Sequence, residues 1–230
     1  MKIGMDEHEQ NGVTTPNIAE RKYPLNLCLV IDRSTSMQGE RLNRVKAAVD
    51  LILDQLGPDD VISLVSFSDR AEVIFPAGSV ENKRPLLSKI QGMIASGGTE
   101  IYQGLSAGVA MMRTVSLANH TNHLILLTDG HTYGDADLCL QLAQQTAKES
   151  IGITAFGIGH EWNDQFLDRL VSPSGGQSGY IDDPQQIIEY LQTCIHGLGN
   201  IYARNVRLLL DFPQAIHLRY GFKLAPYAQP

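Results

Sequence analysis

The chain has 230 residues, 43% of them hydrophobic, which is enough for one domain with a substantial core. Its 25 Asp and Glu residues outnumber its 18 Lys and Arg residues. The resulting net charge of −7 argues against a nucleic acid partner, because affinity for nucleic acid comes mainly from basic side chains at phosphates. No apolar run approaches the roughly 18 residues of a membrane span, and the polar first residues lack the apolar core of a secretory signal. We therefore expect a soluble cytoplasmic domain.

The first half of the chain predicts a strand, a helix and a hairpin. Residues 25–31 form a nearly continuous apolar run, which is typical of a buried strand. Apolar residues then recur every three or four positions, from Leu42 to Leu56, and predict a helix that ends at Gly57-Pro58. The next two apolar runs, at 61–67 and 71–75, are separated by a short polar turn and predict a β-hairpin.

The second half continues the alternation of helices and strands. The predicted elements are helices over about residues 83–94 and 101–115, a strand over 123–128, a helix over 137–149, a strand over 152–158, a helix over 163–170, a short strand to Ile181 and a helix over 183–196. This alternation predicts an α/β fold: a doubly wound, mostly parallel sheet with helices on both faces. Such sheets bind ligands at the carboxyl ends of their strands, where the strand order reverses.

Two apolar strands end abruptly in an acid, Asp32 and Asp129, at this edge of the predicted sheet. Asp32 is followed by Ser34 and Ser36, and three interpretations stay open for these oxygens. The serines could cap the next helix, with Asp32 near its positive end. A phosphate could bind there, but no Gly-rich turn or following Lys supports it. A hard cation such as Mg²⁺ or Mn²⁺ could bind the carboxylate and hydroxyl oxygens, a set that disfavours zinc.

Two distant segments support the cation interpretation. Thr99 follows Gly97-Gly98, which would let the backbone turn sharply beside a bound ion, although Thr99 could simply cap the next helix. Asp129-Gly130 ends the neighbouring strand, although an acid before glycine is also common in turns.

Together, Asp32-x-Ser34-x-Ser36, Thr99 and Asp129-Gly130 resemble the metal-ion-dependent adhesion site of von Willebrand factor A (VWA) domains, bacterial and intracellular members especially. The resemblance covers about residues 24–198. It implies a six-stranded, Rossmann-like sheet with one antiparallel edge strand. It also implies that Ser34, Ser36 and Thr99 are metal ligands, with Asp32 and Asp129 acting largely through waters. Two positions depart from the common family pattern: Thr35 replaces a glycine, and Glu100 replaces an Asn or Asp.

The resemblance implies a binding module and no enzyme. In the family, the bound ion accepts a Glu or Asp carboxylate from a partner protein. The expected cofactor is Mg²⁺ or Mn²⁺, with Ca²⁺ less favoured, and candidate partners include an ATPase or another signalling protein. The alternative is a metal-dependent phosphohydrolase, for which His131 is the nearest titratable candidate. A third alternative is a structural module with a vestigial site, which the five intact residues argue against.

The domain organisation predicted from the sequence has three parts. Residues 1–23 are a polar N-terminal segment, residues 24–198 are the VWA domain, and residues 199–230 are a β extension that could begin a further domain. The two strands predicted in this extension alternate well enough for a ribbon, which we expect to lie against the N-terminal segment.

Three cysteines, Cys28, Cys139 and Cys194, are scattered through the chain without a Cys-x-x-Cys pair. We interpret all three as reduced, buried thiols.

Two places near the strand ends could contact a partner. Tyr133, with Asp135 and Asp137, could help select it, although a solvated loop with a helix cap is the favoured interpretation. Trp162 could be a partner anchor and could equally be packed.

Overall fold

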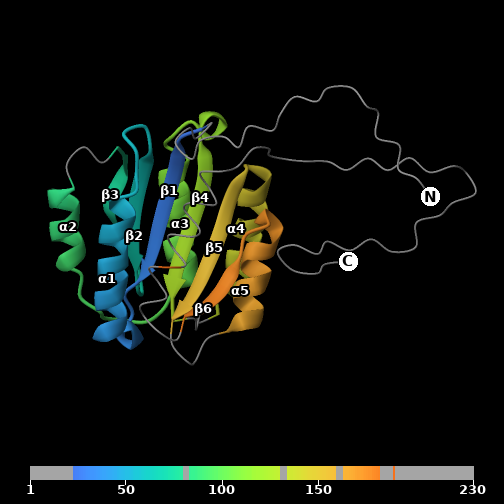
Figure 1. The fold of residues 1–230 in the computed structure, drawn as a ribbon. Coiled ribbons are helices and arrows are strands. Elements are labelled where there is room, and N and C mark those ends of the chain that lie inside the picture. The colour runs from blue at the N-terminus through green and yellow to red at the C-terminus, as the bar shows by residue number, and fades with distance from the viewer. Residues whose placement is uncertain (1–22, 80–82, 130–133, 159–162, 182–188, 190–230) are drawn as a thin grey trace, which may run out of the picture.

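The computed structural model describes residues 23–79, 83–129, 134–158, 163–181 and 189. They form one six-stranded sheet with the strand order β3-β2-β1-β4-β5-β6 (Figure 1). The strands are β1 (Leu25–Asp32), β2 (Val61–Phe67), β3 (Ala71–Gly78), β4 (Thr121–Thr128), β5 (Ile151–Ile158) and β6 (Ser178–Ile181). All neighbours pair in parallel except β2 and β3, which form the predicted hairpin. The predicted fold class and its antiparallel edge strand are therefore confirmed.

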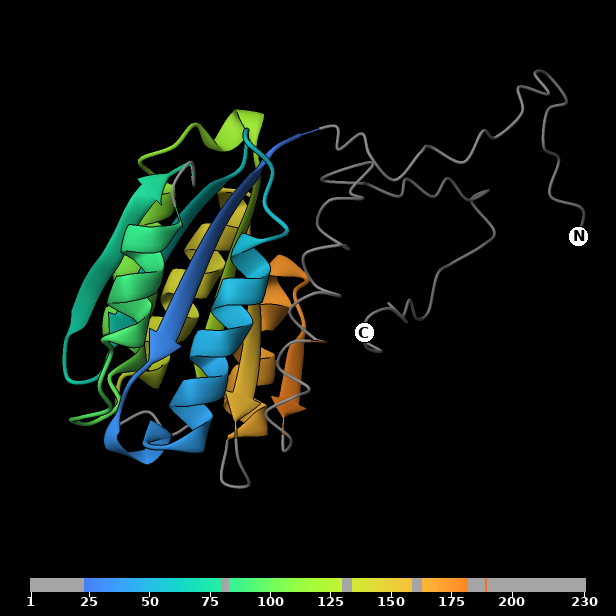
Figure 2. The same ribbon diagram turned by 60° about the vertical axis from the view of Figure 1, so that its left-hand side comes forward.

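Helices cover both faces of the sheet (Figure 2). They are α1 (Glu40–Leu53), α2 (Arg84–Gln91), α3 (Ile101–Met112), α4 (Ala136–Lys148) and α5 (Asp164–Val171). The side chains of β1 alternate between two apolar clusters: Leu27 and Leu29 pack with α1 and α2, whereas Cys28 and Val30 pack with α3, α4 and α5. Burial on both faces explains why β1 reads as a continuous apolar run.

Three elements end where tertiary contacts place them. α2 ends at Gln91, three residues before the predicted end, because the buried Lys46 ammonium binds the carbonyls of Gln91 and Met93. α3 ends at Met112, whose carbonyl accepts a hydrogen bond from Asn26. β3 extends past Pro76 to Gly78, which an edge strand tolerates because one side of its backbone needs no partner.

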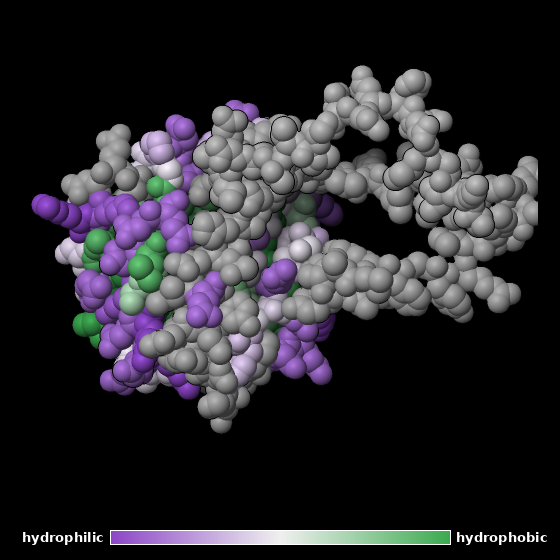
Figure 3. Space-filling view, in the orientation of Figure 1, coloured by the Kyte–Doolittle hydropathy of each residue, from purple (hydrophilic) through white to green (hydrophobic). Residues whose placement is uncertain are grey.

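Several sequence predictions lie outside the described residues. They are the N-terminal segment, the helix over residues 183–196 apart from Glu189, the two strands of the C-terminal extension, Cys194, His131, Tyr133 and Trp162. On the face drawn in Figure 3, the described residues are mainly hydrophilic, with hydrophobic patches among them. Within the described ranges, none of the helices combines the length and the hydropathy of a membrane span.

Candidate functional site

The carboxyl ends of β1 and β4 bring Asp32 and Asp129 to one edge of the sheet. The two strands pair in parallel, with Ile31 opposite Leu127, so Asp32 follows level with Thr128 and Asp129 comes one residue later. Asp32 is fully buried and Asp129 is 6% exposed. Together with Ser34, Ser36 and Thr99 they make up what we call the edge site. It lies at the end of β1, which has β2 on one side and β4 on the other. The strand order reverses at β1, and this is the place where doubly wound sheets bind ligands.

Both carboxylate oxygens of Asp32 accept hydrogen bonds. The backbone N–H of Ser34 donates to Oδ1 at 2.7 Å, and the Thr128 hydroxyl donates to Oδ2 at 2.7 Å. Burial raises the pKa of Asp32 to about 6, the hydrogen bonds from Ser34 and Thr128 offset part of this rise, and the charge of Asp129 adds to it. A cation nearby would favour the ionised form of this carboxylate.

The hydroxyls of Ser34 and Ser36 point toward one another, with their Oγ atoms 3.0 Å apart. The helix-capping interpretation of these serines is wrong, because α1 is capped by Gly39 and Ser34 makes no side-chain cap bond to the short 3₁₀ helix Thr35–Met37. In an octahedron with Mg–O bonds of about 2.1 Å, adjacent ligand oxygens lie about 3.0 Å apart. The two oxygens are hydrogen-bonded to each other, and their separation also fits neighbouring positions around a magnesium ion.

Thr99 follows a sharp glycine turn that contacts the serine segment. Gly97 has φ of +81°, and its carbonyl accepts hydrogen bonds from both the N–H and the hydroxyl of Thr35 at 3.0 Å. Thr99 itself is buried and does not cap α3, whose N-cap is Glu100 without a side-chain hydrogen bond. The Thr35 contacts join the segment that carries Thr99 to the segment that carries the two serines.

Sequence reasoning missed three residues that support the edge site. Arg41 lies 3.5 Å from Asp129 and donates to the Ser36 carbonyl at 3.1 Å. Asp69 accepts from the N–H of Gly98 at 2.8 Å. Asp135, interpreted from the sequence as a partner-selecting, solvated loop or helix-capping residue, accepts from the N–H of Tyr102 in α3 at 2.7 Å. The contacts with Asp129, Gly98 and Tyr102 join residues 88, 29 and 33 positions apart, so no local spacing reveals them.

The donors of the edge site fit a hard divalent cation. Across the described part of the chain, no three His, Cys, Asp or Glu side chains lie together as a metal-binding group. A cation at the edge site would consequently depend on hydroxyl oxygens from Ser34, Ser36 and Thr99 beside the two carboxylates. Oxygen donors of this kind suit Mg²⁺ or Mn²⁺, which retain several waters.

A doubly wound sheet with serine, threonine and aspartate oxygens at its switch point defines an α/β domain with a candidate cation site. The chain belongs to the von Willebrand factor type A domain family, whose model matches residues 26–193.

Relatives and solved structures agree with this assignment. The chain is 32% identical over 200 residues to an uncharacterized protein of Synechocystis sp., covering 86% of the chain and 47% of that protein. It is 27% identical to inter-alpha-trypsin inhibitor heavy chain H1 of Bos taurus, covering 87% of the chain and 24% of the relative. The chain thus spans about half of the first relative and a quarter of the second.

Two solved structures share the fold. A von Willebrand factor type A protein from Catenulispora acidiphila superposes with a TM-score of 0.69 at 22% identity, covering 77% of this chain and 43% of that one. Proximal thread matrix protein 1 from the mussel byssus has a TM-score of 0.66 at 20% identity, covering 77% of this chain and 46% of that one, and its metal-ion-dependent adhesion site holds zinc.

Proposed function

We propose that the chain is a metal-dependent protein-interaction module. In this proposal Ser34, Ser36 and Thr99 hold Mg²⁺ or Mn²⁺ through their hydroxyl oxygens, with support from Asp32 and Asp129. When bound, the cation supplies an electrophilic coordination position that accepts a Glu or Asp carboxylate from a partner protein. Family membership and the zinc at the corresponding motif of proximal thread matrix protein 1 support a cation at this edge.

The single observation that carries the proposal is the pair of serine hydroxyls, which cap neither α1 nor the 3₁₀ helix and lie 3.0 Å apart in a mutual hydrogen bond, a distance that also fits adjacent magnesium ligands. Most atoms that bind the cation directly would then be neutral hydroxyl oxygens. The two negative charges of Asp32 and Asp129 would balance the two positive charges of the cation, with no negative charge in excess. A carboxylate arriving from a partner would be attracted to such a site, and Arg41 adds a further positive charge beside it.

The phosphohydrolase alternative is less favoured by the geometry around Asp32. An aspartyl nucleophile must reach its substrate, yet Asp32 is fully buried and each of its oxygens already accepts a hydrogen bond. The position two residues later, where such enzymes typically carry a second acid, is Ser34. No observation on the described residues favours hydrolysis over binding.

Two titrations test the proposal. Isothermal calorimetry with Mg²⁺ and Mn²⁺ should show one site that Asp129→Ala and Ser34→Ala remove. Water-proton relaxation of the Mn²⁺ complex should then fall when N-acetylglutamate is added, because its carboxylate displaces a bound water, and stay unchanged with N-acetylglutamine. Equal cation binding by wild type and both variants would refute the proposed ligands, and equal responses to the two amino acid derivatives would refute the carboxylate role.

A further inference from the structure

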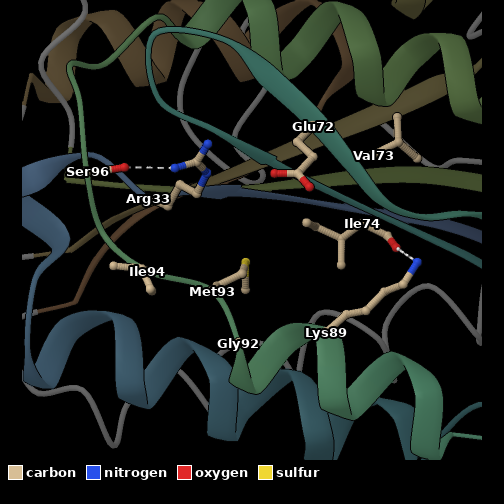
Figure 4. Close-up of a pocket in the computed structure, with 9 residues that line it drawn as sticks. All are labelled: Arg33, Glu72, Val73, Ile74, Lys89, Gly92, Met93, Ile94 and Ser96. Carbon is tan, nitrogen blue, oxygen red and sulfur yellow. Dashed lines mark hydrogen bonds between the residues drawn. The ribbon is translucent and has the colours of Figure 1, made fainter.

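A second candidate binding surface lies beside the edge site, in a pocket of about 370 Å³ that we call the side pocket (Figure 4). One wall is formed by Glu72, Val73 and Ile74 of the edge strand β3. The opposite wall is the C-terminal part of α2 and the segment that follows it, including Met93 and Ile94.

The side pocket shares its backbone with the edge site. Arg33, which lines the pocket, is the residue between Asp32 and Ser34. Its carbonyl accepts a hydrogen bond from the N–H of Ser96 at 2.7 Å, and its guanidinium donates to the Ser96 hydroxyl at 3.0 Å. Ser96 in turn lies three residues before Thr99. A partner held at the edge site would therefore have the side pocket directly beside it.

The lining of the side pocket combines positive charge with exposed apolar surface. Two basic side chains, Arg33 and Lys89, line the pocket, against one acidic side chain, Glu72. None of the ion pairs between described residues joins Glu72 to Arg33 or Lys89. The Nε of Arg33 has no hydrogen-bond partner. Ile94 is 75% exposed and Val73 is 40% exposed, so both offer apolar surface within the lining of the pocket.

Hydrogen bonds hold both walls in place before any ligand arrives. The Lys46 ammonium, 8% exposed, binds the carbonyls of Gln91 and Met93 at 3.0 and 2.7 Å. The Lys89 ammonium binds the carbonyl of Ile74 at 3.0 Å and so ties α2 to β3 (Figure 4). A preformed pocket loses little conformational entropy on binding, which favours its use as a docking surface.

We infer that the side pocket docks a second point of the same partner: an acidic side chain that pairs with Arg33, next to an apolar side chain that packs on Ile94 and Val73. This inference rests on the proposed function, because the carboxylate at the edge site is what places the partner beside the pocket. Two linked contacts raise the affinity above that of either alone, and the spacing between them selects the partner.

The test is an array of immobilised dodecapeptides with one fixed central Glu and all other positions randomised, probed with the full chain in Mg²⁺ and in EDTA. Arg33→Gln and Ile94→Ser alter the side pocket, Asp129→Ala alters the edge site, and Arg169→Gln is the matched control, an exposed arginine on α5. Wild type in Mg²⁺ should enrich peptides with a second acid and an apolar residue at a fixed distance from the Glu. Arg33→Gln and Ile94→Ser should bind these peptides roughly tenfold more weakly, as expected for loss of an interface anchor, while Arg169→Gln behaves as wild type.

The outcomes separate the two proposals. Magnesium-dependent capture without any second preference, or with a preference that survives in both pocket variants, would overturn the side pocket and leave the proposed function standing. Selective capture that persists in EDTA and in Asp129→Ala but is lost in Arg33→Gln and Ile94→Ser would support the side pocket and overturn the metal-dependent function. Capture of no peptide in either buffer would count against both.

Discussion

Asp69, in the turn between β2 and β3, accepts a 2.8 Å hydrogen bond from the backbone N–H of Gly98. The same carboxylate lies so close to Gly97 that any Cβ at position 97 would collide with it. The β2–β3 hairpin therefore fixes the turn that precedes Thr99. Neither Asp69 nor Gly98 is itself one of the proposed metal ligands.

Replacing Asp69 with Ala should weaken Mg²⁺ binding about tenfold, the effect expected when a group that orients a metal ligand is removed. Calorimetric titration measures this directly. Asp59→Ala is the matched control, because it removes the same charge from an exposed position before β2. Equal weakening by both substitutions would show that net charge, and not the Gly98 contact, sets the affinity.

Replacing Arg41 with Gln should change the two ligand affinities in opposite directions. Its guanidinium lies 3.5 Å from Asp129, so it repels a cation and attracts an incoming carboxylate. We expect Mg²⁺ to bind about two- to fivefold more tightly, in line with a partly exposed pair, and N-acetylglutamate to bind the Mn²⁺ complex more weakly. Arg44→Gln, which breaks only an exposed pair with Glu40, should alter neither affinity. Affinities that move together would contradict this role for Arg41.

Gly108→Ala should destabilise the fold even though alanine favours helices. A Cβ at this position would lie 2.7 Å from Val30 and 3.1 Å from the Cys28 sulfur, so α3 would have to move away from the sheet. Overpacking of this kind costs about 1–3 kcal/mol, against about 1 kcal/mol gained in helix propensity. Urea unfolding should show a net loss for Gly108→Ala and little change for Gly92→Ala, where a Cβ meets nothing closer than 3.5 Å.

His123 should make the domain less stable in mild acid. Burial lowers the pKa of His123 to about 4 from 6.5, so between these values the unfolded chain binds a proton that the folded chain does not. The stability is complete above about pH 6.5 and falls as the pH drops toward 4, by a total on the order of 3 kcal/mol. Unfolding measured across this range should be flatter for His123→Gln. An equally steep slope in this variant would contradict the role of His123.

Cys28 and Cys139 should resist thiol reagents in the folded protein. Both are buried and free, and burial raises the pKa of Cys28 to about 12 and that of Cys139 above its ordinary value. A Cys194→Ser variant isolates these two thiols. Ellman's reagent should count neither in buffer and both in denaturant. Rapid reaction of either thiol without denaturant would contradict their described burial.

Sequence periodicity predicted the elements of the described core well because apolar spacing reflects which faces are buried. Their ends were less predictable. The end of α2 depends on Lys46 and the end of α3 on Asn26, both distant in sequence. The five edge-site residues were recognisable as a family pattern, and the structure brings Asp32 and the two serines together at the end of β1 as expected.

The capping question shows what a single sequence leaves open. Serines before a helix fit both a cap and a cation site, and only the position of the backbone distinguishes them. Gly39, with φ of +83°, starts α1 three residues after Ser36 and so leaves the serine hydroxyls away from the helix end. Supporting residues such as Arg41 and Asp135 could not be identified, because their partners come together only through the topology of the sheet.

The central position of β1 has a consequence for the order in which the protein acquires its properties during synthesis. Asp32 and both serines leave the ribosome early, yet the Thr128 hydroxyl that binds Asp32 comes 96 positions later. Until β4 pairs with β1, Asp32 lacks this hydrogen bond and its neighbour Asp129. Any cation affinity of the edge site should therefore arise late and abruptly on a growing chain, once β4 has joined the sheet.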